Sequence, residues 1–384
     1  MPRSSTTEIK EKKISTQHRQ PVYDVHLLFP VLFLVGIGIV MVYSASSAVA
    51  LKRFGTDYFF LKKQGLFALL GIVVLVICCH VPYRIYGFLT YPLLILALLS
   101  LLAIQATGFG YSAGGSTRWL RFGAFTFQPS EFVRIAVIIY LAYSLNKKMG
   151  HLRSYSVGVL PHMIVFGTFS GLMILQPDFG SVVIFGALTW IMLFAGGVRF
   201  LHLFSSFVLA VPIAYFLMFN AAYRIRRIMA FVNPWQFPSD EGYQMIHSFM
   251  AFGTGGIWGS GIGKGYQKLF YLPEPHTDFI FSVIGEELGF LGVLSILVLY
   301  CLILWRGFNI AINVQDIFGS LVAIGLTTAL GLQVCINVGV TLGLLPTKGL
   351  ALPFLSYGGS SLLSNMASMG ILMNIGASGR KKPK

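Results

Sequence analysis

The sequence predicts an all-α integral membrane protein with about ten transmembrane helices and one large outer loop between the seventh and eighth spans. Hydrophobic residues make up 55% of the 384 residues and charged residues only 11%, whereas a soluble domain carries about 25% charged residues. Apolar runs of about 20 residues, the length that crosses a bilayer, recur along the chain. One long segment between two such runs is instead rich in glycine and turn-forming residues.

The apolar runs, taken in order, define the expected spans. They cover approximately residues 25–49, 64–83, 85–106, 122–146, 154–177, 179–198, 200–223, 279–305, 317–345 and 350–376. The first run starts too late and is too long for a cleaved signal peptide. We therefore expect a single polytopic membrane domain over residues 25–376, without a soluble domain.

Basic residues at the two ends predict the orientation of this domain. The tails at 1–24 and 377–384 are rich in Lys and Arg, which favour the cytoplasmic side. Both termini on one side require an even number of spans. Lys147, Lys148 and Arg153 fall on the same side, whereas the basic segment 50–63 departs from the rule.

The net charge of +15 does not indicate nucleic-acid binding, because much of the excess lies in tails that adjoin anionic lipid head groups. Four cysteines show no CxxC pair and no metal-ligand spacing with histidine. They are expected to be small buried apolar residues.

The outer loop, residues 224–278, is long enough to be functional. Residues 243–253 have apolar side chains at helical spacing and predict a short interfacial helix. "GTGGIWGSGIGKG" (253–265) lacks the Walker pattern, because Gly265 follows Lys264 where Ser or Thr is required. Two interpretations stay open: a tightly turning backbone, or amides that face a phosphate.

Three stretches resemble the SEDS family (shape, elongation, division and sporulation). They are "YLPEPHTDFIF…GEELG" with the loop before it, "STRWLRFGAFTFQPSEFVRI" (116–135) and "LPTKGLALPFLSYGGSSLLSN" (345–365). The resemblance extends over residues 25–376, and "GEELG" and "LPTKG" are more similar to the cell-division branch, FtsW, than to the elongation branch, RodA.

The resemblance implies a peptidoglycan glycosyltransferase of the bacterial cytoplasmic (inner) membrane, acting at the division septum. Its substrate would be lipid II, a disaccharide-pentapeptide on undecaprenyl pyrophosphate, polymerised on the outer face. The essential loop aspartate of the family falls on Asp278. The implied partners are a class B penicillin-binding protein, which is a transpeptidase, and other division proteins.

The chemistry of such a transfer assigns roles to the residues. An α-linked donor that gives a β-linked polymer implies inversion, with Asp278 as the general base for the acceptor hydroxyl. Cations of the outer segments, Lys348 among them, would stabilise the departing pyrophosphate together, and Lys268, Arg224 and Arg118 are the favoured candidates. The alternative for each cation is interfacial anchoring of a span.

Other polar residues have two interpretations each. Glu131 and Arg134, three apart on one helix, can form a structural ion pair or line a substrate cavity. Asp178 can cap a helix or contact substrate. His276 can orient substrate or tune Asp278, or it can be a hydrogen-bonded loop residue. Glu286 or Glu287 is expected to pair with a Lys or Arg.

No cluster of carboxylates or histidines predicts a protein metal site. A divalent cation (Mg or Mn) is compatible with the chemistry if the substrate pyrophosphate holds it. Two other functions stay open: a transporter that flips the lipid-linked precursor, and a membrane scaffold. The transporter predicts key polar groups near mid-membrane, whereas the scaffold leaves Asp278 and its loop without a role.

Overall fold

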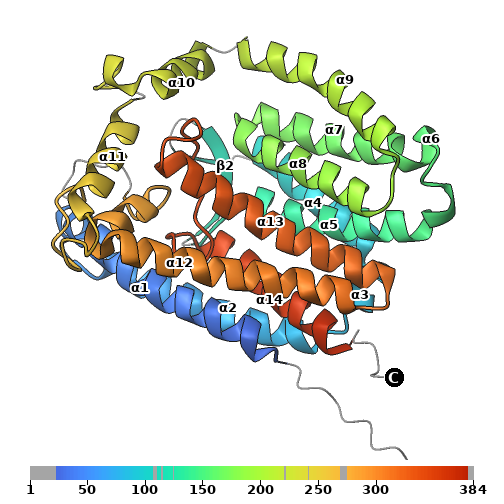
Figure 1. The fold of residues 1–384 in the computed structure, drawn as a ribbon, viewed down its shortest axis with the longest axis horizontal. Helices are drawn as coiled ribbons and strands as arrows, with labels where there is room; N and C mark the ends of the chain where they lie inside the picture. The colour runs from blue at the N-terminus through green and yellow to red at the C-terminus, as the bar shows by residue number, and fades with distance from the viewer. Residues whose placement is uncertain are drawn as a thin grey trace, which may run out of the picture.

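The computed structural model describes residues 23–106, 110–113, 116–123, 125–219, 222–240, 242–268 and 275–378. The predicted basic tails lie almost entirely outside these ranges. The chain folds into a bundle of helices that run roughly along the long axis of the molecule (Figure 1).

Among the described residues, ten helices are 16 residues or longer, which confirms the predicted fold class. They are α1 (Val25–Phe54), α2 (Phe59–His80), α4 (Thr90–Ala106), α5 (Pro129–Lys147), α7 (Leu160–Leu175), α8 (Phe179–Ala195), α9 (Phe200–Phe219), α12 (Ile280–Asn313), α13 (Ile317–Thr341) and α14 (Gly359–Ser378). Shorter helices are α3 (Arg84–Phe88), α6 (Tyr155–Gly158), α10 (Ala222–Val232) and α11 (Tyr243–Gly255), with 3₁₀ turns at Met149–His151 and Pro234–Gln236.

Within the described part of the chain, length and apolar composition allow five helical stretches to cross a membrane, and three shorter apolar helices accompany them. The five are α1, α2, Tyr155–Leu175, α12 and α13. Helices α5 and α14 are less apolar because buried polar side chains, such as Glu131 and Asn365, lie on them. A spanning helix tolerates such groups where they face the protein interior.

The two ends of the described chain lie at one end of the bundle, on the right in Figure 1. Arg306, far along α12, donates to Asp24 at 2.6 Å and joins the start of α1 to this end. The opposite end carries α10, α11 and the sheet (Figure 1). This arrangement matches the even number of spans that the basic tails predict.

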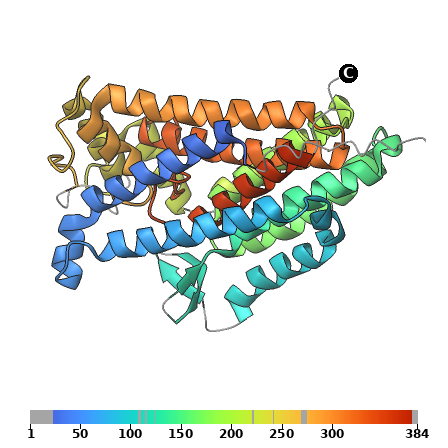
Figure 2. The ribbon, with the colours of Figure 1, turned by 90° about the horizontal axis from the view of Figure 1, so that it is seen from below.

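Three short strands form a small antiparallel sheet that the sequence did not predict. Its strands are β1 (Gly110–Ala113), β2 (Ser116–Phe122) and β3 (Phe125–Phe127), in the order β1-β2-β3. The span expected from residue 122 therefore begins at Pro129, whose fixed φ suits the first turn of a helix. The sheet lies beside α4 (Figure 2).

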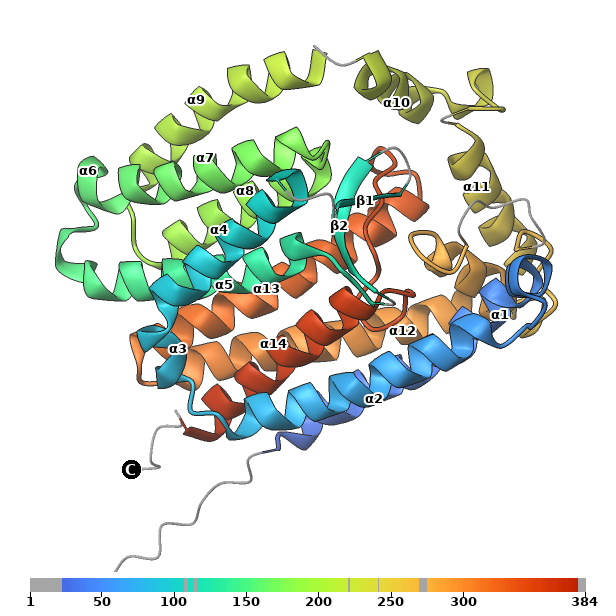
Figure 3. The ribbon, with the colours of Figure 1, turned by 180° about the vertical axis from the view of Figure 1, so that it is seen from behind.

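Residues 342–358 also differ from the prediction, which placed a span from residue 350. They form a non-helical loop that enters the bundle before α14 begins at Gly359. Leu352, Phe354 and Leu355 are buried, and a side chain at Gly38 of α1 would collide with the carbonyl of Phe354. Irregular backbone is tolerated at membrane depth only where protein surrounds it. We call this segment the returning loop; Figure 3 shows it beside the sheet.

Candidate functional site

Asp278 lies in the turn that precedes α12, where three segments meet. Asn337 of α13 donates from one amide nitrogen to the Asp278 carbonyl at 3.0 Å and to the Leu350 carbonyl at 2.6 Å. The Asp278 carboxylate lies against Gly349, since a Cβ built there would be 2.9 Å from Oδ2. Asp278 as a residue is half-buried.

Glu131 and Arg134 form an ion pair and also line a cavity. Arg134 Nη2 lies 2.5 Å from Glu131 Oε2, and Nη1 donates to Gln333 Oε1 at 2.8 Å. A cavity of about 50 Å³ is bordered by both side chains, by Ser181 and by residues 349–351 of the returning loop. Such a volume holds a few water molecules. The two interpretations of this pair are therefore compatible with each other.

Asp178 caps α8, as one of its two interpretations predicted. Its carboxylate accepts from the backbone amide of Ser181 at 3.3 Å and from the Ser181 hydroxyl at 2.7 Å. Arg118 of β2 reaches it at 3.6 Å and donates to the Pro177 carbonyl at 2.5 Å. Ser181 also borders the cavity, so the cap is part of the cavity wall.

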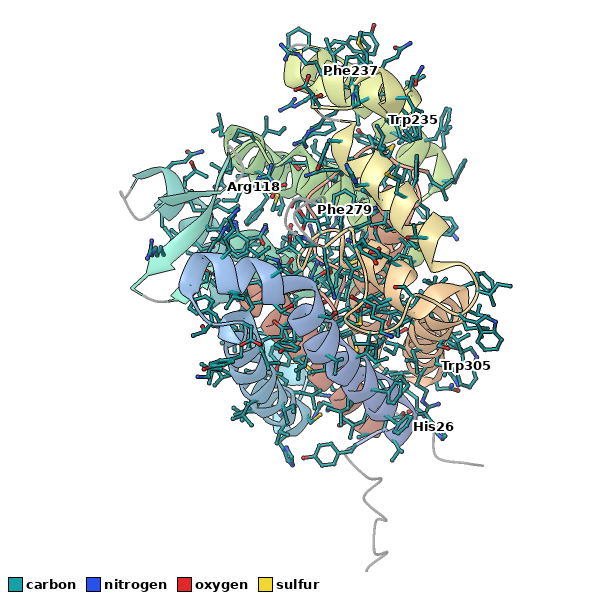
Figure 4. The ribbon with its side chains drawn as sticks, turned by 90° about the vertical axis from the view of Figure 1, so that its left-hand side faces the viewer. His26, Arg118, Trp235, Phe237, Phe279 and Trp305 are labelled. Atoms are coloured by element: carbon teal, nitrogen blue, oxygen red, sulfur yellow. The ribbon has the colours of Figure 1, made fainter. Side chains whose placement is uncertain are left out.

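Arg224 reaches the start of α8 from helix α10. It lies in the first turn of α10, and its guanidinium carbon is 5.1 Å from the centroid of the Phe179 ring. Phe179 directly follows Asp178, so Arg118 and Arg224 approach the start of α8 from two sides. Figure 4, which looks at this end of the bundle, shows Arg118 on the sheet and Phe279, the neighbour of Asp278, further toward the centre.

Lys268 lies in a different cluster, and its predicted contact with substrate has no support in this geometry. Its ammonium is buried and bonds to Glu287 Oε1 at 2.6 Å and to Ser44 Oγ at 3.0 Å. The pairing expected for Glu286 or Glu287 is therefore present, from a loop lysine. A buried pair of this kind is disrupted only at a high cost in free energy.

The glycine-rich loop faces carboxylates of its own chain. Glu286 accepts the amide of Tyr266 at 2.7 Å, and Glu287 accepts the amide of Gly263 at 3.1 Å. The amides that could have cradled a phosphate are thus directed at α12. Gly259 and Gly263 also have positive φ angles of 81° and 84°, as the interpretation of a tightly turning backbone requires.

Helix α12 is interrupted at Gly289, where φ is 67° and ψ is −167°. The same loop forms hydrogen bonds with the helix backbone at this interruption. The carbonyls of Glu286 and Glu287 accept from Ser260 and Gly261 instead of from the helix. The amides of Phe290 and Leu291 donate to Gly256 and Ile257. Every backbone group that the interruption frees at these four α12 residues is therefore bonded to the loop.

His276 is a buried loop residue. Its ring lies 4.5 Å from the Phe60 ring and 5.5 Å from the Tyr357 ring, measured between centroids, and its carbonyl accepts the Tyr357 amide at 2.8 Å. These contacts fasten the segment before Asp278 to α2 and to the returning loop. They favour a structural role for this histidine.

Two features of the site were missed. Gln333 and Asn337 are four apart on α13 and so share a face; both donate to the returning loop. Their amides in an otherwise apolar run were the available signal. Gly349 of "LPTKG" was given no role, and Lys348 was counted only among the outer cations, because nothing in the sequence shows that this segment folds back to Asp278.

Among the described residues, no three or more His, Cys, Asp or Glu side chains form a group that could hold a metal ion. The carboxylates that lie near the cavity are engaged by Arg134, Arg118 and the α8 amides. A divalent cation carried by the substrate pyrophosphate stays a prediction.

Residues 25–381 match the family profile described as cell cycle protein, which covers FtsW, RodA and SpoVE. The chain is 46% identical over 353 residues, 92% of its length and 94% of the relative, to the probable peptidoglycan glycosyltransferase FtsW of Geobacter metallireducens. It is 40% identical over 353 residues to stage V sporulation protein E of Bacillus subtilis, covering 92% and 96% of the two chains.

Two solved structures share the fold. A chain of a peptidoglycan synthase complex, described as coordinating polymerization and crosslinking, matches with a TM-score of 0.76 and 29% identity over 93% of this chain and 98% of that one. The rod shape determining protein RodA of Thermus thermophilus matches with a TM-score of 0.69 and 27% identity, over 94% and 98%.

Proposed function

Because the chain belongs to the cell cycle protein family of FtsW, RodA and SpoVE, we propose that it polymerises lipid II into glycan strands at the outer face of the cytoplasmic membrane. The observation that carries the proposal is the position of Asp278. A half-buried carboxylate at the end of a spanning helix can contact a sugar in water and a carrier held in lipid. Its relatives are named peptidoglycan glycosyltransferases, so a sugar transfer is the reaction to test.

Asp278 acts as the general base in this proposal. The acceptor sugar oxygen forms a bond to the anomeric carbon of the donor, and the bond from that carbon to the pyrophosphate oxygen breaks. The hydroxyl proton passes to the Asp278 carboxylate, and the lipid pyrophosphate leaves with the bonding electrons. A single displacement inverts the anomeric configuration and needs no second carboxylate as nucleophile.

The arginines near the start of α8 stabilise the leaving group. Arg118 and Arg224 converge there, and Arg binds a pyrophosphate through two parallel hydrogen bonds. Glu131, Arg134 and Asp178 form the polar wall between these cations and the returning loop. A Mg or Mn ion held by the pyrophosphate would add charge stabilisation without a protein ligand set.

The cellular setting is a further part of the proposal. The named FtsW relatives favour septal wall synthesis during cell division. A class B penicillin-binding protein would cross-link the product, as expected from the similarity to a synthase complex that couples polymerization to crosslinking. Other division proteins would assemble around the pair.

Polymerisation by the purified protein from lipid II tests the function. We expect Asp278→Asn to lower the rate by about 10²-fold or more, because the amide cannot accept the proton. Lipid II binding should change little, since the base contributes mainly in the transition state. Asp240→Asn, at an exposed position of the outer loop, is the matched control and should behave like the native protein.

A polar cavity inside the bundle is also what a transporter of the lipid-linked precursor would have, so flipping is the alternative function. Transbilayer movement of labelled lipid II in the same vesicles separates the two. Transbilayer movement of lipid II without polymer formation would show that the protein is a flippase and not a glycosyltransferase. Polymer at a near-native rate from Asp278→Asn would remove Asp278 as the base.

A further inference from the structure

Lys348 occupies a position between the two aspartate regions of the site. It lies in the returning loop, one residue before the glycine that contacts the Asp278 carboxylate. Its side chain runs over the start of α8, since a Cβ built at Gly180 would be 3.3 Å from Lys348 Cδ. Gly349 thus contacts Asp278, and Lys348, the residue before it, lies over the start of α8 beside the Asp178 cap.

The ammonium of Lys348 makes no ion pair or hydrogen bond with any residue that the structure describes. Lys268, by contrast, has Glu287 at 2.6 Å and Ser44 at 3.0 Å. Burial lowers the pKa of Lys348 below its usual value, and the Asp178 carboxylate opposes this shift. Lys348 is half-buried and its ammonium is not among the buried polar atoms, so the ammonium is open to a ligand.

We propose that Lys348, and not Lys268, is the lysine that binds the pyrophosphate of the lipid-linked substrate, with Gly349 setting the distance from that cation to the base. The inference rests on the proposed function. Consecutive Cα atoms are about 3.8 Å apart, so the residue that carries the cation directly precedes the residue that contacts Asp278. Donor pyrophosphate and acceptor hydroxyl must approach one anomeric carbon, which requires this proximity.

Lys348 differs from the two arginines in having no partner, among the described residues, that fixes its charged group. Arg118 is held by the Asp178 carboxylate and the Pro177 carbonyl, and Arg224 stacks on Phe179. Each has a partner in the protein that fixes it before substrate arrives. The lysine ammonium is a rotatable point charge, so it can follow a phosphate as the leaving group departs.

Binding of undecaprenyl pyrophosphate to the purified protein tests the inference. Lys348→Met keeps the apolar stem that packs over Gly180 and removes the charge. We expect its affinity for undecaprenyl pyrophosphate to fall about 10- to 100-fold, with a similar rise in KM for lipid II. Binding of undecaprenol, which has no phosphate, should stay unchanged, and Lys348→Arg should recover most of the affinity.

The controls distinguish a ligand contact from a structural one. Lys264→Met, at an exposed site of the outer loop, should bind both lipids as the native protein does. Lys268→Met should lower the thermal unfolding midpoint, because it leaves Glu287 buried without its cation, whereas Lys348→Met should not.

Native affinity of Lys348→Met for undecaprenyl pyrophosphate would overturn the inference, and so would an equal loss for undecaprenol. A native protein that binds undecaprenyl pyrophosphate but makes no glycan would instead refute the proposed polymerase. In that case the binding comparison between Lys348→Met and Lys264→Met still decides the role of Lys348.

Discussion

The Asp278 carboxylate is positioned from two directions, and one of them depends on the absence of a side chain. Asn337 holds the backbone of residue 278, and Gly349 leaves room for its carboxylate. A general base that is displaced by about 1 Å can lose about 10²-fold in rate. In the proposed mechanism, Gly349 therefore positions the base because it has no side chain.

We expect Gly349→Ala to lower the polymerisation rate by about 10²-fold while the protein folds normally. The new methyl group would lie 2.9 Å from Oδ2 of Asp278, too close for contact, so the carboxylate must move. The measurement is kcat for polymerisation beside the thermal unfolding midpoint. Gly358→Ala is the control in the same loop, because its Cβ would meet only Ser361 Cβ at 3.8 Å. Equal activity of the two variants would show that Gly349 does not set the position of the base.

At the scale of elements, α12 and the glycine-rich loop form one backbone unit around Gly289. A Cβ at this position would lie 2.3 Å from the Gly259 amide nitrogen, and the φ angle of 67° is unfavourable for other residues. The helix cannot close the gap itself, because the freed groups are already bonded to residues 256–261.

Gly289→Ala should therefore lower the yield of folded protein and its thermal unfolding midpoint in detergent. Backbone strain alone costs about 1–3 kcal/mol, and the collision with the loop adds to it. Gly36→Ala in α1 is the matched control, since no atom lies within 4 Å of its Cβ position. An unchanged midpoint for Gly289→Ala would mean that α12 can straighten without its loop.

The two ends of the described chain lie at one end of the helix bundle, and the segment between α9 and α12 lies at the opposite end of the bundle (Figure 1). Reporters fused at the N- and C-termini should therefore be found on the cytoplasmic side. A protease site inserted at the exposed Trp258 should be cleaved only from the outer side of intact cells or oriented vesicles. Cleavage from the side that carries the termini would contradict the predicted topology and remove the outer-face polymerase.

The long helices were predictable because hydrocarbon thickness sets the length of an apolar run. The sheet was not, since the aromatic residues of β2 and β3 adjoin α5 and extend its apolar run backward. The returning loop was mistaken for part of a span because it is apolar. Its residues Leu352, Phe354 and Leu355 are buried by protein and not by lipid.

The site was predictable only in part. Asp278 and the Glu131–Arg134 spacing could be found in the sequence, because motif and helical period are local properties. The partner of Lys268 and the approach of Gly349 to Asp278 could not, since each depends on segments that meet only in the folded chain. Glu287 accepts the Gly263 amide, a donor that a phosphate-binding loop would offer to its ligand.

The interruption at Gly289 also limits how the protein can move. Undocking residues 256–266 from α12 would leave two carbonyls and two amides of the helix without partners, and Glu286 and Glu287 would lose amides that bind their carboxylates. Each such loss is unfavourable by about 1–3 kcal/mol, so the open population of this loop is minute. The glycine-rich segment is consequently fixed to α12, despite its composition. Helices α9 and α10, by contrast, contact the rest of the bundle sparsely.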